Sequence, residues 1–165
     1  MKLTRHTPTG TRLPELIEQI TTSTVVASAI ATRDWRPMHH DRDFARNNSK
    51  ARDIFLNTPS LQAILERYLG DVSEETCRLG RLRIRMKQNL CAGDRIHLWG
   101  EVIKRHVDSY GDVWQELTVC IQVDGKIAVE ARALLACPDS AFGLQASPWQ
   151  WRREWRAPAF SDSRR

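Results

Sequence analysis

The chain has 165 residues, a formal net charge of +5 and four cysteines. This length suits one domain whose core needs neither a disulfide nor a metal ion for its stability. The cysteines are scattered and form no Cys-x-x-Cys pair, which argues against a zinc site or a redox motif and favours free thiols in a reducing cytoplasm. The positive charge suits a polyanionic small molecule better than a nucleic acid, because many basic side chains lie near the two ends of the chain.

The N-terminal residues 1–21 are expected to form an arm with an amphipathic piece at 13–20. Its polar first residues lack the apolar stretch of a secretory signal. No apolar run in the chain reaches the roughly 18 to 20 residues that cross a bilayer. We therefore expect neither a membrane segment nor export.

The next segment, residues 22–47, should hold short elements and a rigid turn. Its first part, 22–32, is small and apolar, and its length does not decide between a buried helix and a strand. Pro37 favours a stiff turn over a continuing helix. Asp41 suits the N-cap of a short helix at 42–47.

The clearest helix is predicted at residues 59–69. Its apolar residues recur every three or four positions, so one face is wholly apolar and should pack against something large. Thr58 can cap this helix, Pro59 suits its first turn and Gly70 can end it. The apolar face consists of Leu61, Ile64, Leu65, Tyr68 and Leu69.

Residues 78–137 indicate an antiparallel meander. Over 78–87, apolar and basic side chains alternate, which puts them on opposite faces of one strand. Gly100 is expected to mark a bulge or a bend, and Asp124-Gly125 is a strong hairpin signal. Further turns are expected at Ala92-Gly93-Asp94 and Tyr110-Gly111-Asp112. A helix followed by such a meander predicts an α+β fold.

The chain is thus divided into the arm, a domain over 22–137 and a tail over 138–165. The tail is rich in arginine and contains Trp149, Trp151 and Trp155. These tryptophans could dock a partner or fold back on the chain's own sheet.

Candidate chemistry lies in the predicted turn, where Asp34 and His39 flank Pro37. Imidazole titrates near neutral pH, and a carboxylate can orient it, so such a pair can activate a water and return a proton to carbon. By residue type, His39 and its neighbours His40, Asp41 and Asp43 could also ligate a metal. The remaining histidines have no complementary spacing, so we expect no metal. Motifs for nucleotide cofactors and serine hydrolases are lacking.

The run Asp34-Trp35-Arg36-Pro37-Met38-His39 resembles the Asp-x-Asn-Pro-x-His motif of the MaoC-like (R-specific) enoyl-CoA hydratases. The resemblance covers about residues 22–137. His40-Asp41 and Phe44-Ala45 continue it, and Leu90-Cys91-Ala92-Gly93-Asp94 resembles the turn between the family's first two long strands. Residues 31–43 and 53–57 are similar to small single-hot-dog members from actinobacteria. Some of those act on steroid side-chain CoA thioesters, and some work paired with a second MaoC-like subunit.

The resemblance implies a single hot-dog fold, in which an antiparallel sheet wraps around one central helix. It implies a hydratase acting on a 2-enoyl-CoA, with coenzyme A as part of the substrate and no further cofactor. The partner would be a second copy of this chain or a second MaoC-like subunit, with the active site at the interface between them. We expect a cytoplasmic protein with no nucleic-acid or membrane partner.

The resemblance implies that Asp34 and His39 hold the water that adds to the double bond and move its proton. The family polarises the thioester carbonyl with a backbone N–H near the start of the central helix, where the helix dipole is positive. Candidates here are the N–H groups of Asn57, Thr58 and Ser60, since Pro59 has none. Arg36 replaces the motif's asparagine, and pairing with Asp34 would lower the pKa of that carboxyl.

The basic stripe of the first long strand could contact the phosphates of coenzyme A or form an ordinary solvated face. It consists of Arg81, Arg83, Arg85 and Lys87. Two other functions stay open for this fold. A thioesterase would use a carboxylate on or near the central helix. Glu66 is the only acid inside the predicted helix, and it lies off the apolar face. A non-catalytic subunit would support a catalytic partner.

Overall fold

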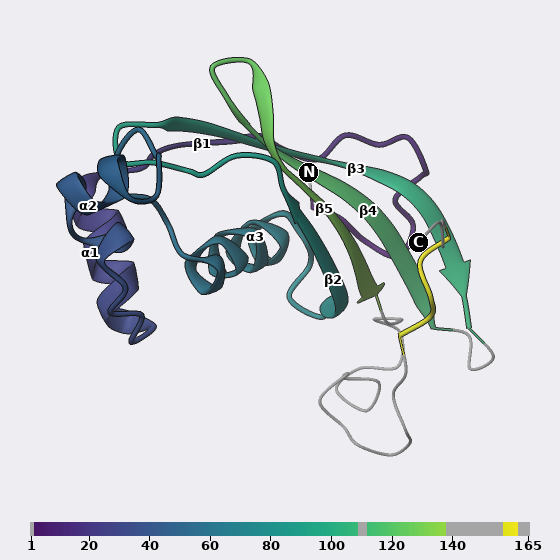
Figure 1. The fold of residues 1–165 in the computed structure, drawn as a ribbon. Helices are drawn as coiled ribbons and strands as arrows, with labels where there is room; N and C mark the ends of the chain where they lie inside the picture. Colours follow the sequence, from purple (N-terminus) through teal and green to yellow (C-terminus); the bar gives the residue numbers. More distant parts are fainter. Residues whose placement is uncertain (1, 109–111, 138–156, 162–165) are drawn as a thin grey trace.

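The computed structural model describes residues 2–108, 112–137 and 157–161, and within them one antiparallel sheet curls around one long helix (Figure 1). The sheet has five strands in the order β1-β3-β4-β5-β2. This is the predicted α+β hot-dog arrangement. The elements are β1 (Leu16–Gln19), α1 (Thr22–Ala31), η1 (Pro37–His39), α2 (Arg42–Asn47), α3 (Thr58–Val72), β2 (Arg78–Met86), β3 (Arg95–Val107), β4 (Val113–Val123) and β5 (Lys126–Cys137).

Helix α3 is the predicted central helix, and it differs from the prediction at both ends. Asn57, not Thr58, caps it, because the Asn57 Oδ1 accepts the Ser60 N–H at 3.1 Å. Gly70 does not end it, since the helix continues to Val72. Gly70 is not among the glycines with a positive φ, so it does not adopt the left-handed conformation in which glycine commonly ends a helix.

The core lies between the apolar face of α3 and the concave face of the sheet. Along β4 and β5 the side chains that point toward α3 are almost all aliphatic, so the helix is packed on an apolar surface. The buried residues that make this contact surface include Leu61, Leu65, Leu69, Leu117, Val119, Ala131, Ala133 and Leu135.

The N-terminal arm takes part in the sheet. Its residues 16–19 form the edge strand β1, in which Leu16 lies opposite Leu98 of β3. The sheet therefore begins before residue 22, where the sequence placed the start of the domain. Local sequence patterns in the arm did not indicate this strand, because its partner β3 lies far along the chain. The undecided segment that follows is a helix, α1, which Thr21 caps by accepting the Thr24 N–H.

The hairpin between β4 and β5 is confirmed. Asp124 and Gly125 have φ values of 49° and 74°, the left-handed pair of a two-residue turn that matches strand twist. Of the bulge or bend expected at Gly100, the bulge is not found there, because the register shifts between Val102 and Lys104 instead. Gly100 stays in register, and its missing side chain leaves room for the hydroxyl of Tyr68. The predicted turn at Tyr110-Gly111 and the tail's Trp149, Trp151 and Trp155 lie outside the described residues.

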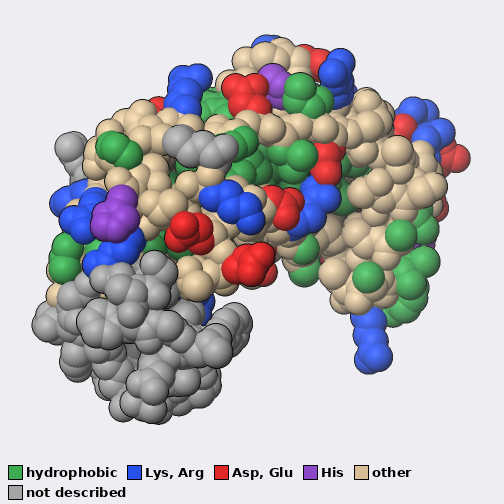
Figure 2. All heavy atoms as spheres, turned by 180° about the vertical axis from the view of Figure 1, so that it is seen from behind, with side chains coloured by type: hydrophobic (Ala, Val, Ile, Leu, Met, Phe, Trp, Pro, Cys, Tyr) green, Lys and Arg blue, Asp and Glu red, His purple; other side chains and the backbone are tan. Residues whose placement is uncertain are grey.

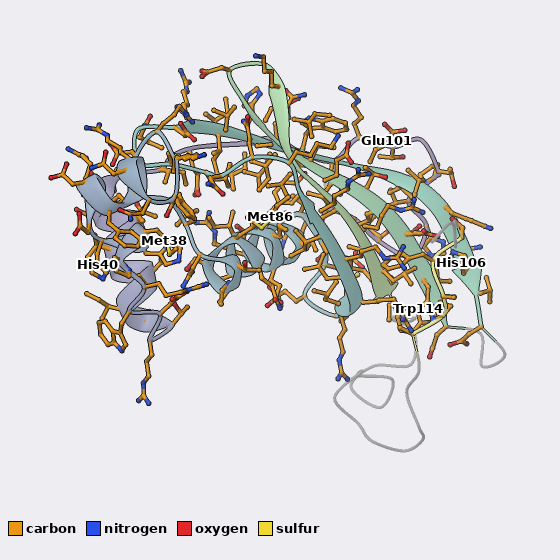
Figure 3. All side chains as sticks on the ribbon, in the orientation of Figure 1. Met38, His40, Met86, Glu101, His106 and Trp114 are labelled. Atoms are coloured by element: carbon orange, nitrogen blue, oxygen red, sulfur yellow. The ribbon has the colours of Figure 1, made fainter. Side chains whose placement is uncertain are left out.

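A second, smaller cluster covers the outer face of the sheet. Trp114 of β4 packs there against Leu134, Ala136 and Phe160. In Figure 3, Trp114 and His106 lie at the end of the sheet that is far from Met38 and His40. Figure 2, a view from behind, shows acidic side chains beside basic ones in the middle of that side. None of the described helices is long and apolar enough to cross a membrane.

Candidate active site

The turn after α1 is built by one residue in the left-handed conformation. Arg33 has φ 55°, and the Asp34 N–H then reaches back to the Ala29 carbonyl at 2.9 Å, which ends the helix. Three residues later Pro37 begins η1, as the stiff turn of the sequence predicts. These two devices place the side chains of Asp34 and His39 together, with Asp34 Oδ2 3.4 Å from His39 Nε2.

Asp34 accepts hydrogen bonds from two other side chains. Arg36 donates to both carboxylate oxygens, from Nε and from Nη2, each at 2.8 Å. The Asn57 amide donates to Oδ2 at 3.2 Å. The Arg36 guanidinium is the main cause that holds the pKa of the Asp34 carboxyl well below its usual range, and Asn57 and His39 act in the same direction. The carboxylate thus stays ionised and serves as an acceptor. The predicted pairing of Arg36 with Asp34 is present.

His39 is buried, with 2% of its surface exposed. Its Nδ1 lies 2.7 Å from the Phe55 carbonyl, which can only accept, so Nδ1 carries a proton. The Phe55 ring also meets the imidazole edge to face. With the proton on Nδ1, the other ring nitrogen, Nε2, faces Asp34. Within the described part of the chain, this buried Nε2 has no hydrogen-bond partner, so it is free to take a proton.

The start of α3 adjoins this pair through a single side chain, Asn57. Its Oδ1 caps the helix, while its Nδ2 donates to Asp34 and, at 2.6 Å, to Thr32. Of the three predicted carbonyl donors, the Ser60 N–H is already occupied by the Asn57 cap. Among the described residues, the N–H groups of Asn57 and Thr58 have no acceptor, so they remain the candidates.

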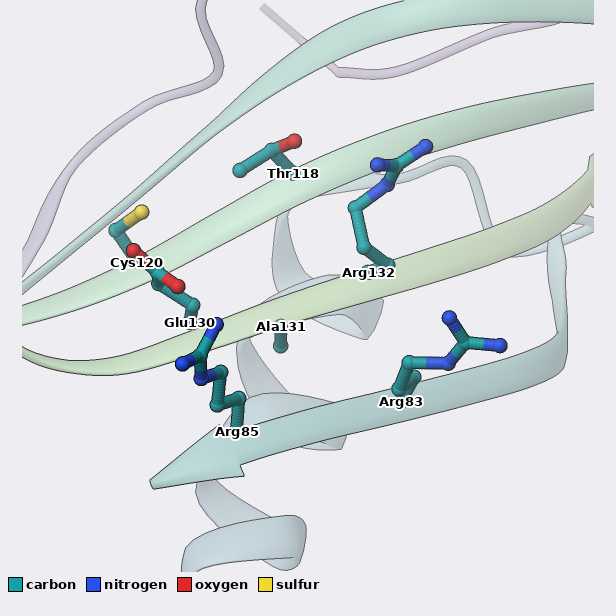
Figure 4. A pocket seen from close by; sticks show the side chains of 7 residues that line it. All are labelled: Arg83, Arg85, Thr118, Cys120, Glu130, Ala131 and Arg132. Carbon is teal, nitrogen blue, oxygen red and sulfur yellow. The ribbon is translucent and has the colours of Figure 1, made fainter. Parts of the chain in front are cut away.

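The basic stripe lies on the outer face of the sheet. It is away from Asp34 and its partners Arg36, His39 and Asn57, which we call the Asp34 cluster. Arg83 and Arg85 line a pocket of about 300 Å³, and no residue of the Asp34 cluster borders it (Figure 4). Arg81 donates to the Ala157 carbonyl, and Lys87 pairs with Glu130. The structure therefore does not bring the stripe and the predicted catalytic pair together, and a phosphate contact of the stripe stays a prediction.

Two other site hypotheses can be placed in the structure. Glu66 is on the exposed face of α3 and accepts a hydrogen bond from Gln62, so it points away from the core. Within residues 2–108, 112–137 and 157–161, no three His, Cys, Asp or Glu side chains gather in a way that could hold a metal ion.

Sequence reasoning missed one functional contact of this site. It treated Asn57 only as a source of a backbone N–H, whereas the side chain joins Asp34 to the helix cap. A signal was present, because asparagine is a favoured N-cap directly before a proline-started helix. The spatial link to Asp34 depends on the left-handed Arg33 and leaves no sequence pattern.

The chain was compared with known proteins and solved structures, and no family model matches it. It is 32% identical over 96 residues to the 3-oxo-4,17-pregnadiene-20-carboxyl-CoA hydratase beta subunit of Mycobacterium tuberculosis. That match covers 58% of this chain and 74% of the relative. A chain of the ChsH1-ChsH2 complex from the same organism is similar with a TM-score of 0.71 and 27% identity, over 79% of this chain and 98% of that one.

Two further structures share the fold at lower identity. The (R)-hydratase from A. caviae involved in PHA biosynthesis has a TM-score of 0.69 at 20% identity, over 81% of this chain and 98% of that one. The MaoC-like dehydratase from Rhodospirillum rubrum has a TM-score of 0.70 at 14% identity, over 79% of this chain and 92% of that one. By its curated relative, its fold and its Asp34–His39 turn, the chain belongs to the MaoC-like hydratase family.

Proposed function

We propose that the protein hydrates a 2-enoyl-CoA thioester, with Asp34 and His39 as the groups that handle the water. The observation that carries this proposal is the pair itself: an ionised carboxylate 3.4 Å from a buried Nε2 whose tautomer the Phe55 carbonyl fixes. This is the arrangement that general acid/base chemistry needs near neutral pH.

In the proposed reaction, Asp34 accepts one O–H of the attacking water and His39 Nε2 takes the other proton. The water oxygen bonds to the β-carbon, and the electrons of the double bond move toward the thioester carbonyl. His39 then returns the proton to the α-carbon, so one water is added and nothing else is consumed. The reverse sequence is the dehydration.

The negative charge that develops on the carbonyl oxygen needs a donor. The N–H groups of Asn57 and Thr58 at the positive end of α3 suit this role, because the Asn57 side chain contacts Asp34 and neither N–H has an acceptor among the described residues. Coenzyme A enters as part of the substrate, and the proposed reaction uses no other cofactor.

The acyl group is proposed from the curated relative, whose name gives it a steroid side-chain CoA substrate. We infer that this protein prefers a bulky polycyclic acyl chain to a short linear one. A steroid 20-carboxyl enoyl-CoA should therefore show a higher kcat/KM than crotonyl-CoA. Equal or reversed values would contradict the substrate assignment but not the hydratase assignment.

A second candidate function is a subunit that supports a catalytic MaoC-like partner. Two solved neighbours are named as complexes of such subunits, ChsH1-ChsH2 and HadBC. In addition, Arg36 takes the place of the motif's asparagine and grips Asp34. We propose a dimer, formed with a second copy or with another hot-dog subunit, in the cytoplasm, where the four free thiols fit a reducing compartment.

The test follows the loss of the conjugated thioester by ultraviolet absorbance. Asp34→Asn and His39→Ala should each lower kcat by roughly 10² to 10⁴-fold. His40→Ala is the matched control, because the neighbouring imidazole is exposed and, among the described residues, its side chain hydrogen-bonds only the Trp35 carbonyl. Wild-type rates in Asp34→Asn or His39→Ala would exclude the proposed roles.

Two outcomes separate the rival functions. Release of free coenzyme A without hydration would identify a thioesterase. If the chain alone is inactive and a second hot-dog subunit restores hydration, the same two variants are assayed in the complex. Full activity of the complex with Asp34→Asn would then assign catalysis to the partner and support to this chain.

A further inference from the structure

Two cysteines lie against each other far from the Asp34 cluster. Cys77 directly precedes β2, and Cys137 is the last residue of β5. Their Sγ atoms are 2.8 Å apart, although both are free thiols in this structure. The sequence favours free thiols for all four cysteines, because they are scattered and form no Cys-x-x-Cys pair.

The sheet register explains why they meet. Strands β2 and β5 are antiparallel, with Arg78 opposite Ala136 and Leu79 opposite Leu135. Extending this register by one position sets Cys77 directly opposite Cys137. Residues directly opposite each other in an antiparallel pair have Cα atoms about 4.5 to 5.5 Å apart, which falls inside the span of a disulfide. The backbone is therefore already positioned for the bond.

We propose that Cys77 and Cys137 form a thiol–disulfide site that a low-molecular-weight disulfide oxidises reversibly. Their roles differ because their surroundings differ. Cys77 is half-buried, whereas Cys137 is 1% exposed and belongs to the core cluster. Hydrogen bonding to Cys137 lowers the pKa of the Cys77 thiol, and the same contact together with burial raises the pKa of Cys137. Cys77 is thus the attacking group.

The exchange balances without any other reactant. The Cys77 thiolate attacks one sulfur of the small disulfide, which forms a mixed disulfide and releases one small thiolate. Cys137 then loses its proton and attacks the Cys77 sulfur, which releases the second small thiolate. The protein loses two protons and two electrons, and the small disulfide becomes two thiols. A dithiol reductant reverses both steps.

The bond would act on the edge of the sheet. β2 is an edge strand, held on one side only by β5, and edge strands are the parts of a sheet most open to mispairing. Cys77 also lies 3.8 Å from the Leu3 carbonyl, so the same point anchors the N-terminal segment. Oxidation would tie the start of β2 to the end of β5 and restrict the unfolded chain over a long loop.

The test treats the folded protein with oxidised glutathione and then blocks the remaining thiols. The intact mass should fall by two hydrogen atoms before blocking, and non-reducing peptide mapping should join Cys77 to Cys137. Cys91 and Cys120, both buried, should stay reduced and serve as internal controls. The oxidised form should melt several degrees higher than the reduced form, and dithiothreitol should reverse the shift.

Variants assign the two roles. Cys137→Ser should leave a stable glutathione adduct on Cys77, whereas Cys77→Ser should take up little glutathione. Cys120→Ser is the matched control and should oxidise as the wild type does. A stable adduct on the wild-type protein, a link that includes Cys91 or Cys120, or no reaction while Cys77 is accessible to a small alkylating reagent would each overturn the proposal.

Discussion

At the scale of single residues, the central feature of the site is the Asp34 carboxylate, which has several partners. Asp34 faces Arg36, Asn57 and His39 at once, so its charge is fixed while the His39 Nε2 lone pair stays available. In the proposed reaction the imidazole carries the proton, and the carboxylate orients water and stabilises the imidazolium. We therefore propose Arg36 as a positioning residue that acts through Asp34.

Replacing Arg36 tests whether it acts through Asp34. In Arg36→Asn the bidentate contact is lost, so the pKa of Asp34 should rise toward its usual value. Asp34 would then become protonated at a higher pH, so the acid limb of the kcat/KM profile should become steeper at its low-pH end. Arg33→Asn is the control, because it removes the same charge from the residue directly before Asp34. Arg33 has a left-handed backbone, which asparagine tolerates, so this variant should leave the acid limb unchanged. An identical acid limb in Arg36→Asn would show that Asp34 does not control it.

At the scale of elements, helix α3 contains a residue that weakens it without a structural reason. Gly70 lies on the exposed face of the last turn of α3, where an added Cβ meets nothing within 4 Å. Gly70→Ala should therefore raise the free energy of unfolding by about 0.5 to 1 kcal/mol, measured by urea denaturation.

The contrasting variant is Gly80→Ala. Gly80 lies at the register shift of β2, where an added Cβ would collide with the Trp114 ring. This substitution should destabilise the protein, because the rigid indole of a buried tryptophan has no room to move. If the free energy of unfolding rises in Gly70→Ala and falls in Gly80→Ala, backbone entropy determines the effect at Gly70 and side-chain packing determines it at Gly80.

The outer face of the sheet holds a fully buried carboxylate, Glu116. It accepts hydrogen bonds from His106 at 2.9 Å, from the Ser161 N–H at 3.1 Å and from Arg132. Burial acts to raise the pKa of Glu116, but these donors outweigh it and hold the pKa below its usual value. Two of the donors come from neighbouring strands and one from the segment after the sheet, so this carboxylate joins the C-terminal residues 157–161 to the sheet.

Glu116→Gln should cost about 1 to 3 kcal/mol at neutral pH, because it removes the carboxylate charge that pairs with the half-buried Arg132. The sign of the pH dependence follows from the lowered pKa. The stability from Glu116 is present above its unfolded pKa, near 4.5, and is lost as the pH falls below that value through the folded pKa. Urea unfolding at pH 7 and pH 4 should thus show a smaller gap between wild type and variant at the lower pH. A gap independent of pH would contradict this account.

Much of this element scale was predictable from local sequence. The period of α3, the alternation in β2 and the Asp124-Gly125 turn each act over a few residues, and each is found where the sequence indicates it. The failures concern contacts across the chain. The strand β1, the bulge after Val102 and the Asn57–Asp34 contact depend on partners far away in sequence, which no local pattern records.

At the scale of the whole molecule, large apolar side chains are exposed at the end that carries the site. Ile30 of α1 is 54% exposed and Trp35, beside Asp34, is 64% exposed. Exposed side chains of this kind are typical of surfaces that a partner covers. The proposed dimer would bury them, which agrees with an active site that lies between subunits.

Trp35→Ser should therefore weaken assembly. Sedimentation should show a shift from dimer toward monomer at low micromolar concentration, and hydration should fall in parallel. Val107→Ser is the matched control, because Val107 is also exposed, at 57%, but lies at the end of β3. If both variants sediment as the wild type does, the surface around Trp35 is not the interface.

The edge strand β1 also has a consequence for how the protein is made. Leu16 emerges from the ribosome long before its partner Leu98, so the first strand synthesised is placed only after β3 has been completed. Until then the nascent chain has to keep an unpaired strand out of contact with other chains. Pairings over such distances are slow and expose strand edges to aggregation. Yield during expression should therefore depend on how fast translation passes through residues 95–107.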